Sequence, residues 1–189
     1  MKKDIEFEIK TQIEQEFKGL PKNFVVILSV NLHIYNQTCL LLLAYLIKKL
    51  QLEGLYVALN KPFETIREEL KKNDLDVNEI SCIDAVSKET DKYPKIDKVL
   101  YLEDPSSITE LLFLIKAICN EGKIKFIFLN SLDTLLLYND IKEVEKFIRS
   151  LVNKARKSDI SVVIMSPKEK SEEDVIASVT QFCDKEIEL

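Results

Sequence analysis

Short apolar runs alternate along the chain with longer segments in which apolar positions recur every three or four residues. The first pattern is typical of strands buried on both faces, and the second of amphipathic helices that cover them. Strands are expected at residues 24–30, 55–59, 80–83, 99–102, 125–129 and 160–165, with an edge strand at 186–189. This alternation predicts an α/β fold with a mainly parallel central sheet and helices on both faces.

Helices are expected between these strands and before the first one. The expected ranges are 4–17, 37–50, 62–72, 105–120, 141–157 and 172–182. Pro62 and Pro105 suit the first turn of a helix, where a missing amide hydrogen does no harm. The polar segment 86–96 is expected to be a loop. Because the sequence has no recognisable linker or repeat, we expect one domain over residues 1–189, with residues 1–22 as an N-terminal helix and lead-in.

Composition narrows the classes of protein that fit. Of 189 residues, 46% are hydrophobic and 31% are charged, as in soluble globular proteins. The net charge of −5 argues against nucleic acid as a partner. The longest uninterrupted apolar run, 39–47, is too short to span a bilayer, so a cytoplasmic protein without a membrane partner is expected. Four scattered cysteines and one histidine argue against a zinc site and for reduced core thiols.

The loop after the first expected strand has the spacing of a phosphate-binding loop. Residues 31–38 read N-L-H-I-Y-N-Q-T, whereas the motif reads G-x-x-x-x-G-K-[ST]. Asn31 and Asn36 stand where the motif has glycine, Gln37 replaces the lysine, and Thr38 is retained. An ordinary polar turn between a strand and a helix is the alternative interpretation.

These substitutions change what the loop can bind. Asparagine is the non-glycine residue that best tolerates the positive φ of such loops, so the turn itself can be kept. Gln37 has no charge, and loss of a charge-assisted phosphate contact costs about 1.5–3 kcal/mol, or roughly ten- to a hundredfold in affinity. We expect either an open anion-binding nest or a loop filled by its own side chains, such as His33 or Tyr35.

Several segments, in this order, resemble the KaiC-like branch of the RecA-type P-loop ATPases, a branch that includes archaeal Rad55-like proteins. The resemblance covers about residues 23–189. It rests on the loop at 31–38, L-Y-V-A-L-N-K at 55–61, I-D-A-V-S at 83–87, F-I-F-L-N-S-L-D-T-L-L-L-Y at 126–138 and F-C-D at 182–184. It implies a RecA-like fold in which the Walker A and Walker B motifs are degenerate.

The resemblance also implies which charges are missing. In this family, the strand at 55–59 leads to the carboxylate that activates water, and Asn60 and Lys61 stand there in this chain. The strand that ends in a magnesium-coordinating aspartate ends here in Asn130, followed by Ser131. Together with the lost lysine, three charged positions of the family are therefore substituted.

Phosphoryl transfer depends on such charges for positioning and electrostatic stabilisation. We therefore expect a catalytically inactive pseudo-ATPase that serves as a protein-interaction or regulatory module, with a second copy or an active paralogue as its partner. No residue is assigned a catalytic or metal-binding role, although enzyme activity stays open. The apolar runs 40–43 and 135–138 are expected in the core, with contact to another subunit as the alternative.

Two other functions stay open. The first is weak binding of ATP and magnesium, or residual ATPase activity, with Lys61 as a replacement cation and Asp133 as a carboxylate. The vestigial nucleotide site would consist of Asn31, Asn36, Gln37, Thr38, Lys61, Asn130 and Ser131. The second is an accessory role in DNA repair or recombination, which rests on the resemblance alone.

Overall fold

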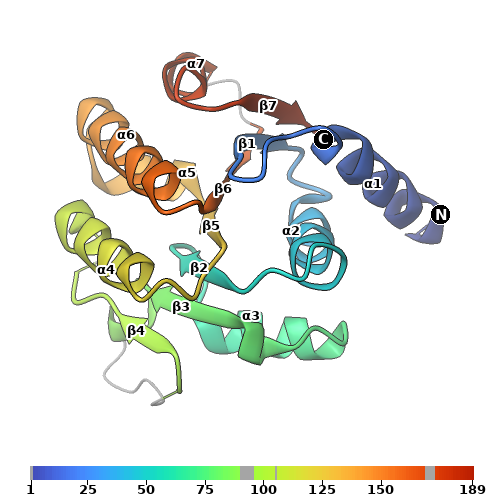
Figure 1. Cartoon of the computed structure of the whole chain (residues 1–189), viewed down its shortest axis with the longest axis horizontal. Helices are drawn as coiled ribbons and strands as arrows, with labels where there is room; N and C mark the ends of the chain where they lie inside the picture. The colour runs from blue at the N-terminus through green and yellow to red at the C-terminus, as the bar shows by residue number, and fades with distance from the viewer. Residues whose placement is uncertain (1, 90–95, 105, 169–172) are drawn as a thin grey trace.

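The computed structural model describes residues 2–89, 96–104, 106–168 and 173–189. Its centre is a seven-stranded sheet with the order β4-β3-β2-β5-β6-β1-β7, in which all neighbouring strands are parallel (Figure 1). The strands are β1 (Val25–Val30), β2 (Gly54–Ala58), β3 (Ile80–Asp84), β4 (Val99–Tyr101), β5 (Phe126–Asn130), β6 (Ser161–Pro167) and β7 (Lys185–Glu188). The predicted α/β fold with a parallel sheet is confirmed.

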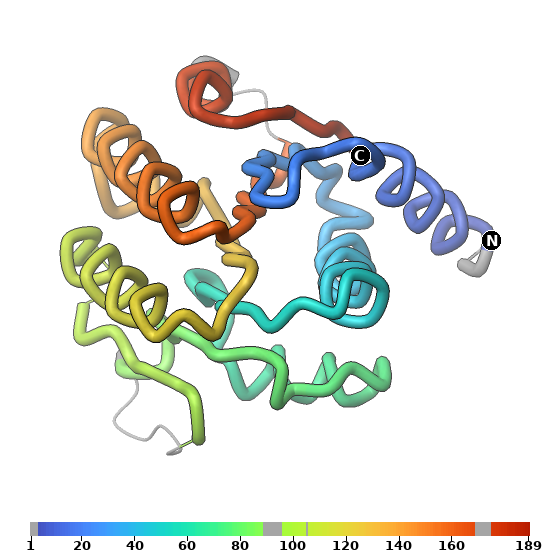
Figure 2. Tube along the Cα trace, in the orientation of Figure 1, coloured from blue at the N-terminus to red at the C-terminus, as the bar shows by residue number. Residues whose placement is uncertain are grey.

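Helices cover both faces of the sheet, as the trace in Figure 2 shows. They are α1 (Lys2–Phe17), α2 (Tyr35–Ala44), α3 (Phe63–Lys72), α4 (Ile108–Asn120), α5 (Leu132–Tyr138), α6 (Ile141–Lys157) and α7 (Glu173–Thr180). A π-helical segment, Tyr45–Lys49, continues α2, and short 3-10 turns lie at Val77–Glu79 and Ser87–Glu89. Buried residues of α1, α2 and α3 belong to one core cluster, and those of α4, α5, α6 and α7 to another.

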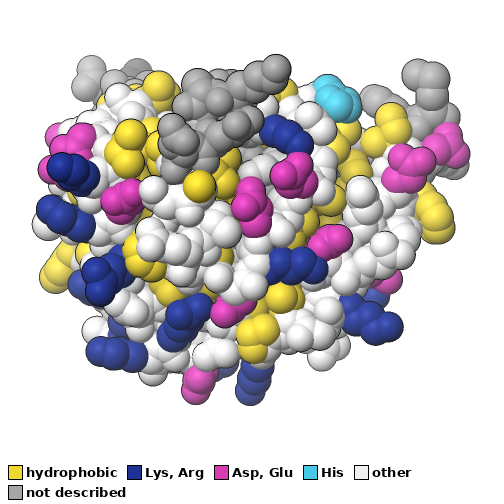
Figure 3. Space-filling model, turned by 90° about the horizontal axis from the view of Figure 1, so that it is seen from above, with side chains coloured by type: hydrophobic (Ala, Val, Ile, Leu, Met, Phe, Trp, Pro, Cys, Tyr) yellow, Lys and Arg dark blue, Asp and Glu magenta, His cyan; other side chains and the backbone are white. Residues whose placement is uncertain are grey.

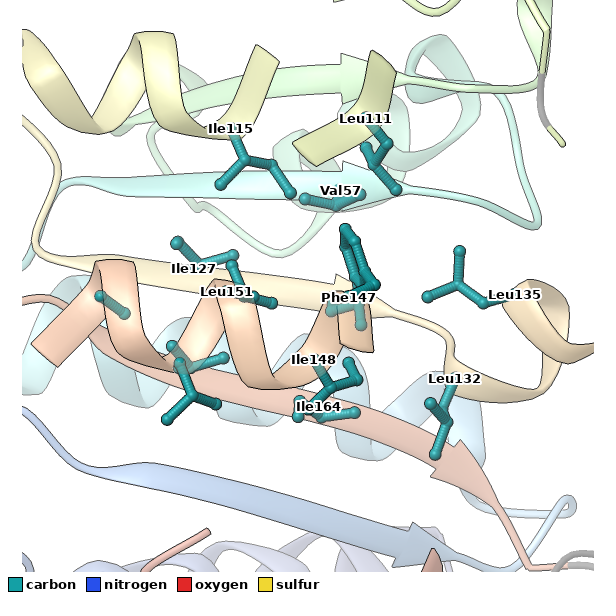
Figure 4. Packing of buried hydrophobic residues seen from close by; sticks show 14 of the residues in the cluster. Val57, Leu111, Ile115, Ile127, Leu132, Leu135, Phe147, Ile148, Leu151 and Ile164 are labelled. Atoms are coloured by element: carbon teal, nitrogen blue, oxygen red, sulfur yellow. The ribbon is translucent and has the colours of Figure 1, made fainter. Parts of the chain in front are cut away.

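The alternation of side chains along β5 separates these two cores. Phe126 and Phe128 belong to the cluster under α2, whereas Ile127 and Leu129 belong to the cluster under α4 and α6. Figure 4 shows Ile127 beneath α6, near Val57 and Ile115 of neighbouring elements. Successive strand residues point to opposite faces, so Asn130 lies on the same face as Phe128, two residues earlier, and faces α2. This places the end of β5 opposite the loop that follows β1.

Three features of the helices differ from the expectation. The second helix begins at Tyr35, within the loop motif, and its last turns are π-helical rather than α-helical. The helix α5 was not expected, because a seven-residue, mostly apolar run has no period that separates a helix from a buried strand. Residues 90–95, 105 and 169–172 lie outside the described part, so parts of the expected loop 86–96 and the expected helix starts at 105 and 172 do too.

The surface mixes charges of both signs. Figure 3 shows one face, seen from above the view of Figure 1, on which lysine and arginine side chains alternate with aspartate and glutamate. The part of this face that the structure describes therefore has no broad basic patch of the kind that nucleic-acid binders present. Over the described residues, none of the helices combines the length and the apolar character needed to cross a bilayer.

Candidate functional site

Parallel strands place polar residues from distant parts of the sequence at one edge of the sheet. β1 leads into the loop 31–34, β2 leads to Asn60 and Lys61, and β5 ends at Asn130. All three strands point the same way, and ligands of open α/β sheets bind at the carboxyl ends of the strands. The structure therefore brings Asn36, Asn60, Lys61 and Asn130 together at the edge where a ligand is expected.

Asn130 is the centre of a buried hydrogen-bond network. Its Oδ1 accepts a hydrogen bond from the hydroxyl of Tyr35 at 2.6 Å and a long one from Nδ2 of Asn60 at 3.4 Å. Its Nδ2 donates to the hydroxyl of Tyr56 at 2.6 Å. An amide can accept and donate at once, whereas a carboxylate can only accept. The amide of Asn130 therefore accepts from one tyrosine and donates to the other. With an ionised aspartate at this position, the hydroxyl of Tyr56 would have to become the donor.

Tyr35 and Tyr56 are both inside the protein. Tyr35 is 7% exposed and Tyr56 is 2% exposed. Burial raises the pKa of both hydroxyls well above the ordinary value of 10.0, because an ionised phenolate would lose its hydration. The ring of Tyr56 also stacks on that of Phe128, with centroids 5.4 Å apart. Both tyrosines are therefore neutral, well-packed members of the core at this edge.

The backbone of the loop is turned upon itself. The amide of Ile34 donates to the carbonyl of Asn31, that of Tyr35 to Leu32, and that of Thr38 to Ile34. The amide and the side-chain Nδ2 of Asn31 both donate to the carbonyl of Leu189, which fixes the start of the loop against β7. These donors are therefore used within the chain.

The loop does not have the geometry of an anion nest. A nest alternates right- and left-handed residues so that successive amides converge. Residues 31–38 are all described, and none of them has a positive φ. Tyr35 is buried and its hydroxyl reaches Asn130, whereas His33 is exposed. Of the two arrangements left open by the sequence, these positions favour the loop filled by its own side chain.

Lys61 is a cation beside this loop. Its Nζ donates to Oδ1 of Asn36 at 2.8 Å and lies 4.0 Å from the carboxylate of Glu69. About a third of its side chain is exposed, so the ammonium group keeps contact with water. Lys61 and Asn36 therefore bridge the end of β2 and the first turn of α2.

The remaining residues of the predicted site are less accessible. Thr38 is fully buried, and its Oγ1 has no hydrogen-bond partner among the described residues. Ser131 is also buried and shares a hydrogen bond of 3.2 Å with the hydroxyl of Thr134. One carboxylate oxygen of Asp133, Oδ1, is buried without a partner in the described part, and Gln37 is partly buried.

The described part of the chain also lacks a clustered set of metal ligands. Within the described ranges, no three His, Cys, Asp or Glu side chains gather as they would around a metal ion. The four cysteines are free thiols, and Cys39, in the second turn of α2, is buried, which raises its pKa to about 12. A thiol with that pKa is protonated and inert at neutral pH.

Asp84 supports the loop that carries Asn60 and Lys61. It ends β3 and is 1% exposed. One carboxylate oxygen accepts from the amide of Phe63 at 2.8 Å and from the hydroxyl of Ser87 at 2.7 Å. The other accepts from the amides of Val86 and Ser87, both at 2.9 Å. Asp84 thus fixes the start of α3 directly after the site.

Two members of the network were not among the predicted site residues. Tyr35 was considered only as a side chain that could fill the loop, and Tyr56 was not singled out. The available signal is that Tyr56 lies in a strand otherwise composed of apolar residues, because a buried tyrosine hydroxyl needs a partner. The partner itself comes from β5, 74 residues away in the chain, which no local pattern identifies.

Comparisons with known proteins agree with this fold. A family model described as the ATPase KaiC matches residues 38–188. The fold is similar to that of a KaiC-like protein from the hyperthermophilic archaeon Pyrococcus horikoshii, with a TM-score of 0.64 and 14% sequence identity. That superposition covers 90% of this chain and 73% of the other. No curated protein matches the chain.

Proposed function

The chain belongs to the KaiC family of ATPases, and we propose that within this family it is a non-catalytic member that serves as a protein-interaction or regulatory module. The observation that carries this proposal is the contact between Tyr35 and Asn130. A side chain from the loop that would have to receive a phosphate is buried against the end of β5, at 2.6 Å from Oδ1 of Asn130. A side chain of the loop, rather than a ligand, is therefore the hydrogen-bond partner of Asn130.

The geometry of the loop supports the same proposal. Phosphate binding at such a loop needs backbone amides that converge on the anion and a nearby cation. Here the amides of Ile34, Tyr35 and Thr38 donate within the turn, and no positive φ opens the loop. Entry of a triphosphate would require Tyr35 to leave the core and break its hydrogen bond, which adds a cost to every binding event.

The residues at this edge also do not fit magnesium. Magnesium is bound by oxygen ligands, usually carboxylates and phosphates, in octahedral geometry. Oδ1 of Asn130 already accepts from Tyr35, and its Nδ2 is turned to Tyr56. The hydroxyl of Thr38 is fully buried.

An exposed apolar corner supports the interaction role. Leu137 is 78% exposed, Tyr138 is 50% exposed and Ile141 is 49% exposed, where α5 meets α6. The expectation that the run 135–138 is core is thus correct for Leu135 and wrong for Leu137 and Tyr138, because α5 is an amphipathic helix at the surface. Clustered exposed apolar side chains mark contact surfaces. A second copy or an active family member is the proposed partner.

Calorimetric titration with ATP and magnesium tests the loss of nucleotide binding. We expect no saturable heat for the wild-type chain, which corresponds to a Kd above about 1 mM. The variant Tyr35→Gly, combined with Gln37→Lys and Asn130→Asp, is expected to bind more tightly, while Tyr138→Gly serves as a matched control at an exposed tyrosine. Micromolar binding by the wild type, or magnesium-dependent hydrolysis that Thr38→Ala abolishes, would falsify the proposal.

The interaction role has a separate test. Sedimentation of the chain alone and mixed with an active KaiC-family ATPase should reveal a complex that Leu137→Asp weakens at least tenfold. Leu32→Asp is a suitable control, because Leu32 is 63% exposed but lies in the loop after β1. Equal effects of the two substitutions, or the absence of any complex, would count against this surface as the contact.

Weak nucleotide binding is a second candidate, which the position of Lys61 favours. Its ammonium group lies at Asn36 and is solvent-accessible, so it would be the available cation if Tyr35 moved. Any residual ATP binding is then expected to fall about tenfold in Lys61→Met, the loss of one charge-assisted contact. The matched control is Lys71→Met on the exposed side of α3; an equal loss in both variants would exclude a specific role for Lys61.

A further inference from the structure

A pocket lies at the edge of the sheet opposite to Asn130, near the amino ends of β1 and β2. Its volume is about 320 Å³. Phe24 precedes β1 and Leu52 precedes β2, and both line it. The end of α1 and the chain after the π-helical segment complete it, through Phe17 and Leu50. The pocket is therefore separate from the crevice at Asn130, which lies at the carboxyl ends of the strands.

The inner surface of this pocket is aromatic. The rings of Phe17 and Phe24 meet edge to face with centroids 5.3 Å apart, and Tyr45 meets Phe17 in the same way at 5.5 Å. Phe17 and Phe24 are buried, whereas Leu50 is 38% exposed at the rim. Such a surface gains free energy when an apolar group displaces water from it. The volume lies near the lower end of the range of about 300–1,000 Å³ typical of ligand pockets.

The π-helical segment positions Tyr45. The amide of Leu50 donates to the carbonyl of Tyr45 at 3.1 Å, five residues earlier, and the amide of Leu52 donates to that of Leu46. π-helical turns are rare and frequent at functional sites. Tyr45 also lines a smaller pocket of about 160 Å³ between α1 and α2, together with Ile13 and Leu41. One tyrosine thus forms the wall between two adjoining apolar pockets.

The charge of Lys22 determines whether the larger pocket favours an anionic or a cationic ligand. Lys22 is the charged residue that lines the larger pocket, and no aspartate or glutamate lines it. Its ammonium group has no hydrogen-bond or ion-pair partner among the described residues. In the smaller pocket, Nζ of Lys49 lies 5.6 Å from the centre of the Tyr45 ring and pairs with Glu14 at 2.6 Å. Lys22, an exposed lysine in the lining of an apolar pocket, is complementary to an anion with an apolar body.

We propose that this pocket binds a small anionic amphiphile, whose apolar body packs on Phe17, Phe24 and Tyr45 and whose carboxylate meets Nζ of Lys22. The proposal does not depend on the state of the crevice at Asn130. A neutral molecule of the same size gains only the apolar contact, and a cationic one is repelled by Lys22. The ligand class is therefore set by one exposed lysine, while the affinity comes from the buried rings.

Octanoate, octanol and octylamine form a matched series that tests this proposal. In titrations of the full chain followed by two-dimensional NMR, octanoate is expected to shift amides of residues 17–24 and 45–52 in a saturable manner. Octanol is expected to bind about five- to tenfold more weakly, and octylamine not at all. Lys22→Glu should abolish the preference for octanoate, whereas Lys71→Glu, with the same change in net charge, should keep it.

A second variant separates the shape of the pocket from its charge. Leu20→Trp places a larger side chain at the wall of the pocket and is expected to reduce binding of all three probes, with a melting temperature close to that of the wild type. Equal binding of octanoate and octanol, equal effects of Lys22→Glu and Lys71→Glu, or the absence of saturable shifts for every probe would each overturn the proposal.

Discussion

Two buried polar residues, Asp84 and Asn130, lie at the ends of strands in the same sheet and have different hydrogen-bond environments. Asp84 at the end of β3 and Asn130 at the end of β5 are both at least 95% buried and both face the side of the sheet that α2 and α3 cover. Asp84 is surrounded by donors only: three backbone amides and the hydroxyl of Ser87. Asn130 lies between hydroxyls and an amide that can serve as donors or acceptors.

The difference shows what a buried charge needs in order to persist. A carboxylate is tolerated in a core when several fixed donors replace its hydration, which the backbone around Asp84 supplies. Around Asn130, the partners are tyrosines whose hydroxyls adapt to a neutral amide. At this edge of the sheet, Asp84 is therefore a charged residue that stabilises the fold. Asn130, which stands where the resemblance to RecA-type ATPases implies a magnesium-coordinating aspartate, is part of a neutral network.

Replacing Asp84 should have the largest effect. Asp84→Asn removes the charge and points an amide group at backbone donors, which leaves at least one buried N–H without an acceptor. We expect a loss of about 3 kcal/mol in the free energy of unfolding, because hydrogen bonds to a charged group contribute about 1.5–3 kcal/mol each. Urea denaturation measures it. Asp97→Asn, at an exposed position, is the control and should change stability by less than about 0.5 kcal/mol.

The converse substitution sharpens the comparison. Asn130→Asp buries a carboxylate where side-chain hydroxyls, rather than backbone amides, must stabilise it, and we expect a loss of about 2 kcal/mol at pH 8. Burial raises the pKa of such a carboxyl group in the folded state, so protonation favours folding and the deficit should shrink as the pH falls. Unfolding curves at pH 8 and pH 5 test this; a deficit that grows at pH 5 would show that the site stabilises the charge.

Removing one hydroxyl should have a smaller effect. Tyr35→Phe keeps the ring in place and deletes the hydrogen bond of 2.6 Å to Asn130. We expect a loss of about 1 kcal/mol, the usual net contribution of one buried hydrogen bond between neutral groups. Tyr138→Phe, at a half-exposed position, should be neutral. If Tyr35→Phe is also neutral in thermal unfolding, Tyr35 is held by packing alone and its hydroxyl does not lock the loop.

The sequence predicted the sheet and most helices because strand and helix periodicity depend on neighbours in the chain. It also located Asn130, Asn36 and Lys61 at one edge, since parallel strands bring their carboxyl ends together. It could not choose between an open loop and a filled one, because that choice depends on whether Tyr35 meets Asn130, 95 residues away. The same limit applies to Tyr56, to the short helix α5 and to the π-helical turns at Tyr45.

The smallest expected effect is the loss of folding stability that the buried tyrosines cause at alkaline pH. Burial raises the pKa of Tyr35 above its unfolded value near 10, so the stability contributed by this group is constant well below pH 10 and falls as the pH rises through 10 and beyond. The slope approaches about 1.4 kcal/mol per pH unit well above pH 10, and because the unfolded tyrosine is only partly ionised near its pKa, the loss between pH 10 and 10.5 is about 0.4 kcal/mol per group. Tyr35→Phe should remove one slope of this size from urea unfolding curves, and Tyr56→Phe another. An identical slope in wild type and Tyr35→Phe would mean that Tyr35 ionises as freely in the folded chain as in water, and the comparison between a neutral edge and a charged one would lose its basis.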